Sequence, residues 1–202
     1  MTQHTEQRPL RRDAQRNIDA LLDAAKQVFG TSGVDAPAKE IADLAGVGVG
    51  TLYRHFPKRS DLVKAVFQAE VDATADAAPV LAAEHPPVVA LEKWLHRYTQ
   101  FLVTKRGLAS ALHSGDPAFD ALPAYFIGRL GPALGSLLDA AVAAGAVRAV
   151  VSPQDLLYAV SKLSLPMEDE EPDHGRRMLD LLVDGLRYGA GKDPAGQGGD
   201  RA

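Results

Sequence analysis

Residues 40–62 read EIADLAGVGVGTLYRHFPKRSDL, and this stretch decides how the chain folds. Three glycines at alternate positions stand directly before a threonine, two aromatic residues and several basic residues. Glycine-rich runs beside a hydroxyl often bind nucleotide phosphates, and their fingerprints are G-x-G-x-x-G after a strand or G-x-x-x-x-G-K-[ST]. The spacing here fits neither fingerprint, and a short helix is predicted before the glycines. The stretch therefore does not predict a nucleotide-binding loop.

The same glycines predict a tight turn between two short helices. Ile41 and Leu44 belong to a first helix that stops at Gly46, since glycine readily takes the positive φ that a helix end requires. A second helix is expected from about 48 to 55, before Pro57. Gly48 begins this helix, and Gly50 leaves its first turn without a side chain. The backbone there can approach a partner closely.

The second helix carries residue types that suit a DNA duplex. Tyr53 and His55 can bond phosphate oxygens, and the small apolar Val49 can touch a thymine methyl group. The amino end of a helix also attracts phosphate. Residues 44–60 contain no acidic residue but include Arg54, Lys58 and Arg59. Leu52 and Phe56 are instead expected to anchor the helix in the core.

The remainder of the chain is predicted to be helical. Gly33 and Pro37 separate the first two helices, and Ser60 is expected to cap a later one. No segment alternates long enough to require a strand, so the expected fold class is all-α. Pro123 and Pro132 should bend or interrupt the helix that contains them. The other expected helices run from about 11–30, 60–83, 88–107, 119–144, 153–165 and 174–189, with a short segment over 108–113.

Composition limits the class of protein. The chain has 202 residues, 46% of them hydrophobic, and no cysteine, so disulfides and thiolate metal sites are excluded. No apolar run is expected to reach the roughly 20 residues that cross a bilayer, and no signal peptide is recognised at the start. We expect a soluble cytoplasmic protein without membrane contact. The net charge is −4, but the first 70 residues carry a small positive balance.

Enzymatic motifs are absent from the sequence. Neither H-E-x-x-H nor G-x-S-x-G occurs, and the six histidines are scattered. His96 with His113 lacks an obvious third metal ligand. We therefore expect no enzyme activity, no cofactor and no metal site.

Residues 11–67, with IADLAGVGVGTLYRHFPKRSDLVKAVF at their centre, resemble the DNA-binding domain of TetR-family transcriptional regulators. The resemblance implies that the helix near Gly48 is a recognition helix and that a residue starting the preceding helix also faces DNA. Gly48 and Pro37 depart from the family pattern, which often has Ser and Thr there. The implied DNA-binding residues are Lys39, Gly48, Val49, Gly50, Thr51, Tyr53, Arg54, His55 and Lys58.

The resemblance also implies an organisation for the whole chain. We expect a basic flexible arm over 1–10, a helix-turn-helix domain over 11–59, a helical ligand-binding and dimerisation domain over 60–190 and a disordered tail over 191–202. Arg8, Arg11 and Arg12 are expected to follow the DNA backbone or enter a minor groove. Candidate ligand-binding residues are Trp94, Tyr98, Phe101, His113, Tyr125, Phe126 and Arg129. Candidate dimer-interface residues are Leu156, Val160, Leu163, Met178, Leu182 and Leu186.

The function implied is a ligand-responsive repressor. A homodimer would hold two recognition helices against a palindromic operator, and a small-molecule effector would change their separation by moving the helix over 60–83. The effector itself is not identified by the residues. The alternative is a ligand-independent dimeric DNA-binding protein without an effector pocket.

Overall fold

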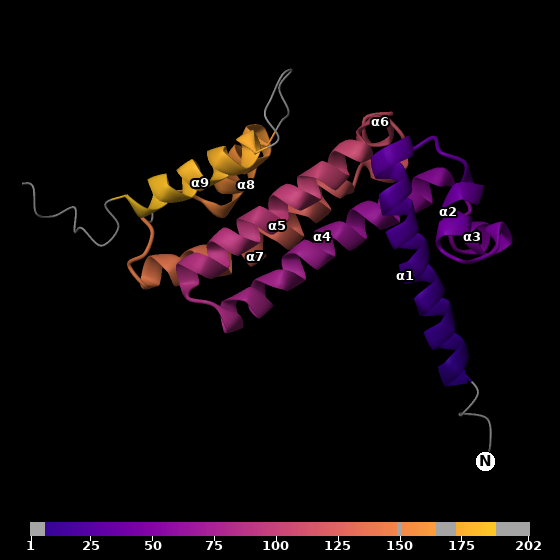
Figure 1. The fold of residues 1–202 in the computed structure, drawn as a ribbon, viewed down its shortest axis with the longest axis horizontal. Helices are drawn as coiled ribbons and strands as arrows, with labels where there is room; N and C mark the ends of the chain where they lie inside the picture. Colours follow the sequence, from indigo (N-terminus) through magenta and orange to yellow (C-terminus); the bar gives the residue numbers. More distant parts are fainter. Residues whose placement is uncertain (1–6, 149–150, 165–172, 189–202) are drawn as a thin grey trace, which may run out of the picture. The chain divides into compact units, whose positions relative to one another are not determined.

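The computed structural model describes residues 7–148, 151–164 and 173–188, and every regular element within these ranges is a helix (Figure 1). The predicted all-α fold class is confirmed. Residue contacts divide the chain into two compact units. Unit 1 comprises the described residues up to Asp72 together with Val103–Phe126. Unit 2 comprises Ala73–Leu102 and the described residues from Ile127 onward. This division falls later than the domain boundary expected at residues 59 and 60.

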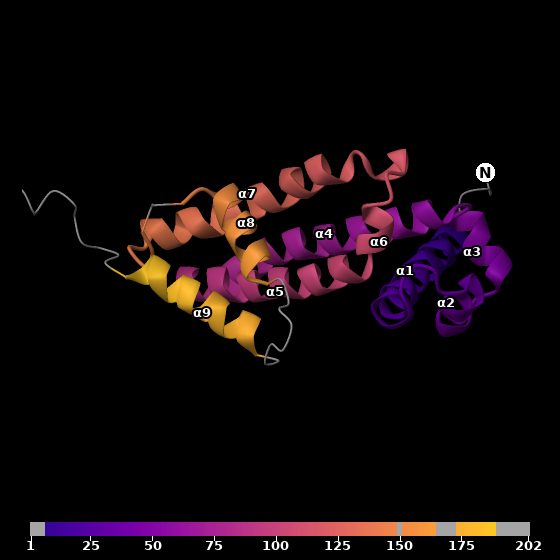
Figure 2. The same ribbon diagram turned by 90° about the horizontal axis from the view of Figure 1, so that it is seen from above.

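Unit 1 is built around the first helix. It contains α1 (Gln7–Ser32), α2 (Ala38–Leu44), α3 (Val49–His55), the start of α4 (Arg59–Glu84) and the end of α5 (Pro87–Gly107). It also holds α6 (Ala109–Leu112), the 3₁₀ turn η1 (Pro117–Phe119) and the start of α7 (Leu122–Ala143). Both views show α2 and α3 beside α1 (Figures 1 and 2). The core of unit 1 includes Leu21, Ala25, Val28, Phe29, Ile41, Leu52, Leu62 and Val66.

The starts of α1 and α4 differ from their predictions. Helix α1 already begins at Gln7, so a flexible arm over 1–10 is wrong for residues 7–10; residues 1–6 lie outside the described ranges. Helix α4 begins at Arg59, because the Asp61 carboxylate accepts a hydrogen bond of 3.0 Å from the backbone N–H of Lys58. This carboxylate takes the capping role that was predicted for Ser60.

The predicted helix over 119–144 is interrupted at its start. Phe119 lies in η1, which the Asp116 carboxylate caps by accepting a 2.9 Å hydrogen bond from the Ala118 backbone N–H. Helix α7 then begins at Leu122, so Pro123 stands in the first turn, where a missing N–H costs little. The helix continues through Pro132.

Unit 2 packs its helices around three stacked aromatic rings. It holds the remaining parts of α4, α5 and α7, with α8 (Pro153–Leu163) and α9 (His174–Arg187). Helices α8 and α9 contact each other, and the Arg148 N–H donates to the Leu186 carbonyl over 2.9 Å (Figure 2). The core of unit 2 includes Leu91, Trp94, Leu95, Tyr98, Phe101, Leu130, Leu134, Leu157 and Val160.

One segment is more apolar than the sequence analysis expected. Pro117–Ala143 is long and apolar enough to cross a membrane by length and composition alone, with a mean hydropathy of 1.2. The expectation that no apolar run reaches such a length was therefore wrong. Leu130, Leu134 and Leu137 of this segment are buried inside the molecule, and a core helix meets the same criterion.

Replacing Gly107 with Ala should destabilise unit 1. A Cβ atom at Gly107 would lie 3.0 Å from the backbone oxygen of Phe29 in α1, and a backbone atom cannot move away as a flexible side chain can. We expect a loss of about 1–3 kcal/mol in the free energy of unfolding, measured by urea denaturation.

Gly128→Ala is the matched control. Gly128 lies inside α7, and its added Cβ would have nothing within 4 Å, so the higher helix propensity of Ala should stabilise by about 1 kcal/mol. Equal effects of the two substitutions would contradict the close contact at Gly107.

Candidate nucleic-acid interface

The turn between α2 and α3 is closed by backbone hydrogen bonds. Gly46 has a φ of 68°, as predicted, and the chain reverses there. Its N–H donates to the Asp43 carbonyl over 3.2 Å, and the Val47 N–H donates to the Ala42 carbonyl over 3.0 Å. This pair of bonds is the Schellman arrangement, which a residue with a Cβ atom would strain at Gly46. The corner is therefore fixed by local backbone geometry.

Helix α3 divides into an inner and an outer face. Leu52 and Phe56 are buried, which confirms their prediction as core anchors. Tyr53 between them is 53% exposed, and a Cβ atom at Gly50 would have nothing within 4 Å. Gly48 begins the helix, and its carbonyl accepts from the N–H groups of Thr51 and Leu52. The outer face thus leaves side chains and bare backbone accessible.

Three polar side chains on and after this face are uncommitted. Tyr53, Arg54 and Lys58 are exposed, and within the described ranges their side chains make no hydrogen bond or ion pair. His55 is half-buried, with its ring centroid 6.4 Å from that of Phe56. Lys39 of α2 is exposed but pairs with Asp43 over 2.6 Å. Of these residues, only Lys39 would have to give up an ion pair, the one with Asp43, in order to bind an anion.

The structure gathers the nine DNA-binding candidates at one corner of unit 1. Eight of them lie between residues 48 and 58, and Lys39 is on the adjoining helix α2. Of the nine, Val49, Thr51 and His55 are half-buried and the other six are exposed: Lys39, Gly48, Gly50, Tyr53, Arg54 and Lys58.

Arg59 does not belong to the basic surface, although the sequence grouped it with Arg54 and Lys58. Its guanidinium donates to the Ala36 carbonyl and lies over the Phe29 ring, 5.6 Å from the centroid. Its buried Nη1 has no hydrogen-bond partner in the described part of the chain. The side chain turns inward and joins the start of α4 to α1 and to the loop before α2, a role that only the tertiary contacts reveal.

The aromatic ligand-binding candidates of unit 2 form core instead of a pocket. Trp94, Tyr98 and Phe101 are buried, and consecutive rings stack with centroids 5.8 Å and 6.1 Å apart. The Trp94 indole donates to the Thr74 carbonyl over 2.8 Å, and the Tyr98 hydroxyl donates to the Leu157 carbonyl over 3.2 Å. Burial raises the pKa of Tyr98, which therefore stays protonated. The polar atoms of Trp94 and Tyr98 are therefore both hydrogen-bonded within the chain.

The other four ligand-binding candidates are also engaged elsewhere. His113 is exposed, and its Nδ1 lies 2.7 Å from the Ala109 carbonyl. Tyr125 donates to Asp72 over 2.7 Å, and Arg129 donates to Asp76 over 2.9 Å. Phe126 is buried beneath the Lys105 ammonium, whose pKa burial lowers. His113, Tyr125 and Phe126 belong to unit 1, and the other candidates belong to unit 2.

Two surface hollows occur away from these candidates. The hollow of unit 1 measures about 360 Å³ and is bounded by Val34, Arg59, Ser110, Asp116 and Phe119, among others. The hollow of unit 2, here called the α4–α5 hollow, measures about 570 Å³. Its lining consists of Ala73, Asp76, Ala77, Val80, Leu81, His85, Lys93 and Arg97. None of the seven predicted ligand residues lines either of these two hollows, so their role in ligand binding stays a prediction.

The dimer-interface candidates divide into two groups. Leu156, Val160 and Leu186 are buried within the chain itself, so their assignment to an interface was wrong: α8 and α9 use these residues to pack on their own unit. Met178 and Leu182 are half-buried and Leu163 is 36% exposed, so these three keep accessible surface. Tyr158 and Leu181 are also exposed but were not among the predicted residues, because helical spacing identifies a face without saying what covers it.

Two protein-family models match most of the chain. Residues 21–66 match the family model described as bacterial regulatory proteins, tetR family. Residues 86–188, half of the chain, match the model described as Transcriptional regulator SbtR-like, C-terminal domain.

Solved structures agree with the family models. A TetR transcriptional regulator from Streptomyces coelicolor is 38% identical, with 84% of this chain and 98% of that chain covered and a TM-score of 0.72. A TetR transcription regulatory protein from Mycobacterium vanbaalenii is 34% identical, covers 89% and 99% of the two chains, and has a TM-score of 0.70.

Curated relatives match over a shorter part. An HTH-type transcriptional regulator from Staphylococcus aureus is 39% identical over 64 residues, which are 31% of this chain and 35% of the relative. The chain thus aligns with about a third of the curated relatives' length. Because the family models match residues 21–66 and 86–188 and the two solved structures cover most of the chain, the chain belongs to the TetR family of transcriptional regulators, DNA-binding proteins that are not enzymes.

Proposed function

We propose that this TetR-family regulator binds a palindromic operator as a homodimer and leaves it when a small effector binds. The DNA-binding part of this proposal rests on the two faces of α3, one buried and one exposed. Leu52 and Phe56 hold the helix from the inside, while Gly50 and Tyr53 stay accessible on the outside. A helix held in this way can enter a major groove without being displaced.

The exposed residues then take separate tasks at the duplex. Val49, Gly50 and Thr51, in the first turn of α3, are assigned to the base edges. Tyr53, His55 and Lys58 are assigned to phosphates, and Arg54 to phosphate or guanine. Lys39 contacts DNA from α2 when its ammonium leaves the ion pair with Asp43 and binds a phosphate instead. Because Gly48 and Pro37 offer no capping hydroxyl, no side chain caps α2 or α3, and phosphate affinity depends more on the basic side chains.

Dimerisation is assigned to the exposed apolar residues of α8 and α9. Met178, Leu181 and Leu182 are spaced by three and four residues and share one face of α9. Leu181 is 64% exposed, and Tyr158 and Leu163 add exposed apolar surface from α8. A second copy covering these groups would remove them from water. A two-fold pair would also present two α3 helices to one operator.

The α4–α5 hollow is the best-supported effector site. Its volume suits a small molecule, and Ala77, Val80 and Leu81 supply apolar lining. His85 and Lys93 add two basic groups, and neither side chain has a partner within the described residues. This lining favours a small carboxylate with an apolar tail. Helix α4 supplies residues to both units, so a shift of α4 would connect the effector to the DNA-binding corner.

The alternative is a dimer that binds DNA without an effector. It is supported by the burial and stacking of Trp94 and Tyr98, whose rings pack against one another in the core. Under either reading the partner is chromosomal DNA, which places the protein in the cytoplasm.

Selection of genomic fragments from the source organism should recover a duplex that the protein binds in a salt-dependent manner. On that duplex, Lys58→Ala should reduce the slope of log affinity against log salt by about one, because one phosphate contact is lost. Fluorescence anisotropy at several salt concentrations measures the slope.

Lys162→Ala is the matched control, since Lys162 is an exposed lysine on α8, in unit 2. It should leave the slope unchanged. Failure of the wild-type protein to retain any fragment would reject the DNA-binding proposal, and an unchanged slope for Lys58→Ala would remove Lys58 from the phosphate contacts.

Leu181→Asp should convert the dimer into monomers, because a carboxylate would have to be buried at the centre of the interface. Sedimentation velocity at micromolar concentration measures the change. Val103→Asp, at another exposed apolar residue, should leave the dimer intact. A Leu181→Asp protein that sediments as the wild type would place the interface elsewhere.

Short-chain carboxylates should raise the melting temperature and release the selected duplex, whereas the corresponding neutral amides should do neither. Lys93→Ala should abolish both effects, with Lys162→Ala again as the control. If no carboxylate produces either effect, the ligand-independent alternative is favoured.

A further inference from the structure

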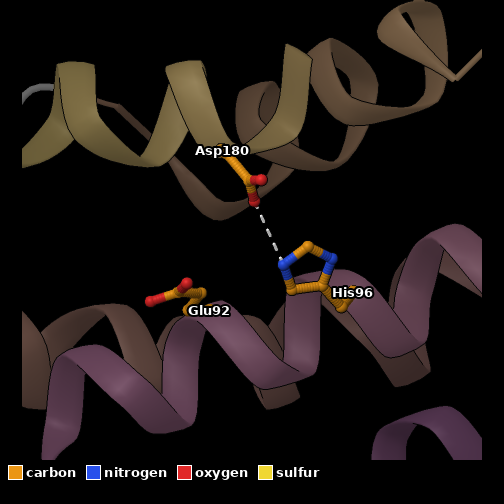
Figure 3. Close-up of side chains that lie close together, drawn as sticks. All are labelled: Glu92, His96 and Asp180. Carbon is orange, nitrogen blue, oxygen red and sulfur yellow. Dashed lines mark ion pairs between the residues drawn. The ribbon is translucent and has the colours of Figure 1, made fainter. Parts of the chain in front are cut away.

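Three side chains with metal-binding chemistry come together in unit 2. Glu92 and His96 lie four residues apart on α5 and therefore share one face of that helix. Asp180 approaches them from α9 (Figure 3). One ligand atom from each residue can be chosen so that the three atoms lie within 4.8 Å of one another. The sequence analysis missed this group, because Asp180 follows His96 only after several intervening helices.

The separations are close to those of a zinc site. The His96 Nε2 atom lies 3.3 Å from Asp180 Oδ1. Zinc bonds of about 2.1 Å in a tetrahedron place neighbouring ligand atoms about 3.4 Å apart. One edge of such a site is therefore already formed, and a Glu92 oxygen lies within 4.8 Å of both atoms. All three residues are half-buried, which leaves an open position for water.

The charge around the group favours a cation. Glu92 accepts a hydrogen bond from Arg187 over 2.9 Å, and the same guanidinium lies 3.6 Å from Asp184. In these contacts of the described residues, the carboxylates of Glu92, Asp180 and Asp184 share one arginine and one imidazole. With the imidazole neutral the cluster has an excess of negative charge. When Glu92 turns towards a metal ion, Arg187 can retain its ion pair with Asp184.

We propose that Glu92, His96 and Asp180 bind one divalent transition-metal ion, best represented by zinc. One imidazole and two carboxylates fit zinc, with water as the fourth ligand, whereas magnesium and calcium prefer oxygen ligands alone. The bound ion joins α9 to α5 and so fixes the helix that carries Leu181. This site is separate from the α4–α5 hollow and does not depend on the proposed effector.

Isothermal titration of the full-length, untagged, chelator-treated protein with zinc should show one site per chain. Saturating zinc should also raise the melting temperature by roughly 5 °C, because the ion binds only the folded arrangement of α5 and α9. His96→Gln and Asp180→Asn should each abolish the titration signal and the shift. Circular dichroism confirms that both variants are folded.

His113→Gln is the matched control, since His113 is exposed and lies outside the group. It should bind zinc as the wild type does. The proposal is overturned if wild-type protein gives no signal up to millimolar zinc, if magnesium binds equally well, or if zinc binding survives either His96→Gln or Asp180→Asn.

Discussion

The burial of Leu52 and Phe56 is the constraint on which the DNA-binding corner depends. A helix of seven residues is not stable by itself in water, so α3 exists because its inner face is held in unit 1. The Schellman turn at Gly46 sets the direction in which α3 leaves α2, and Arg59 fixes the chain where α4 begins. These contacts use only the inner side of the corner. Tyr53, Arg54 and Lys58 can therefore stay exposed without a partner in the described residues, as their proposed DNA contacts require.

In unit 2 the large aromatic side chains are buried, unlike Tyr53 on the exposed face of α3. Trp94 and Tyr98 have polar atoms that must be paired when buried, and carbonyls of Thr74 and Leu157 accept their hydrogen bonds. The paired rings consequently serve packing, while the basic and apolar residues around Lys93 remain available at the surface. The same unit assembles an acidic cluster around His96 between two helices. Both sites that we propose for this unit thus lie outside its aromatic core.

The prediction was most successful where the signal was local. The glycine at Gly46 needs positive φ whatever the rest of the chain does, and the three- and four-residue apolar spacing identified all the longer helices. Capping was less predictable, because Asp61 rather than Ser60 bonds the free N–H at the start of α4. The ligand-binding set stays a prediction for a similar reason: helical spacing finds the inward face, but a filled core and a lined cavity use the same aromatic residues.

By itself, the sequence determined the all-α fold class, the corner at Gly46 and the set of residues on the outer face of α3, since backbone preference and helical period are properties of neighbouring residues. Tertiary structure alone decided that Arg59 turns inward, that Leu156, Val160 and Leu186 are covered by their own chain, and that Asp180 meets His96. These outcomes depend on contacts between residues far apart in the sequence, and the burial of one side chain is set by its partners rather than by its own chemistry.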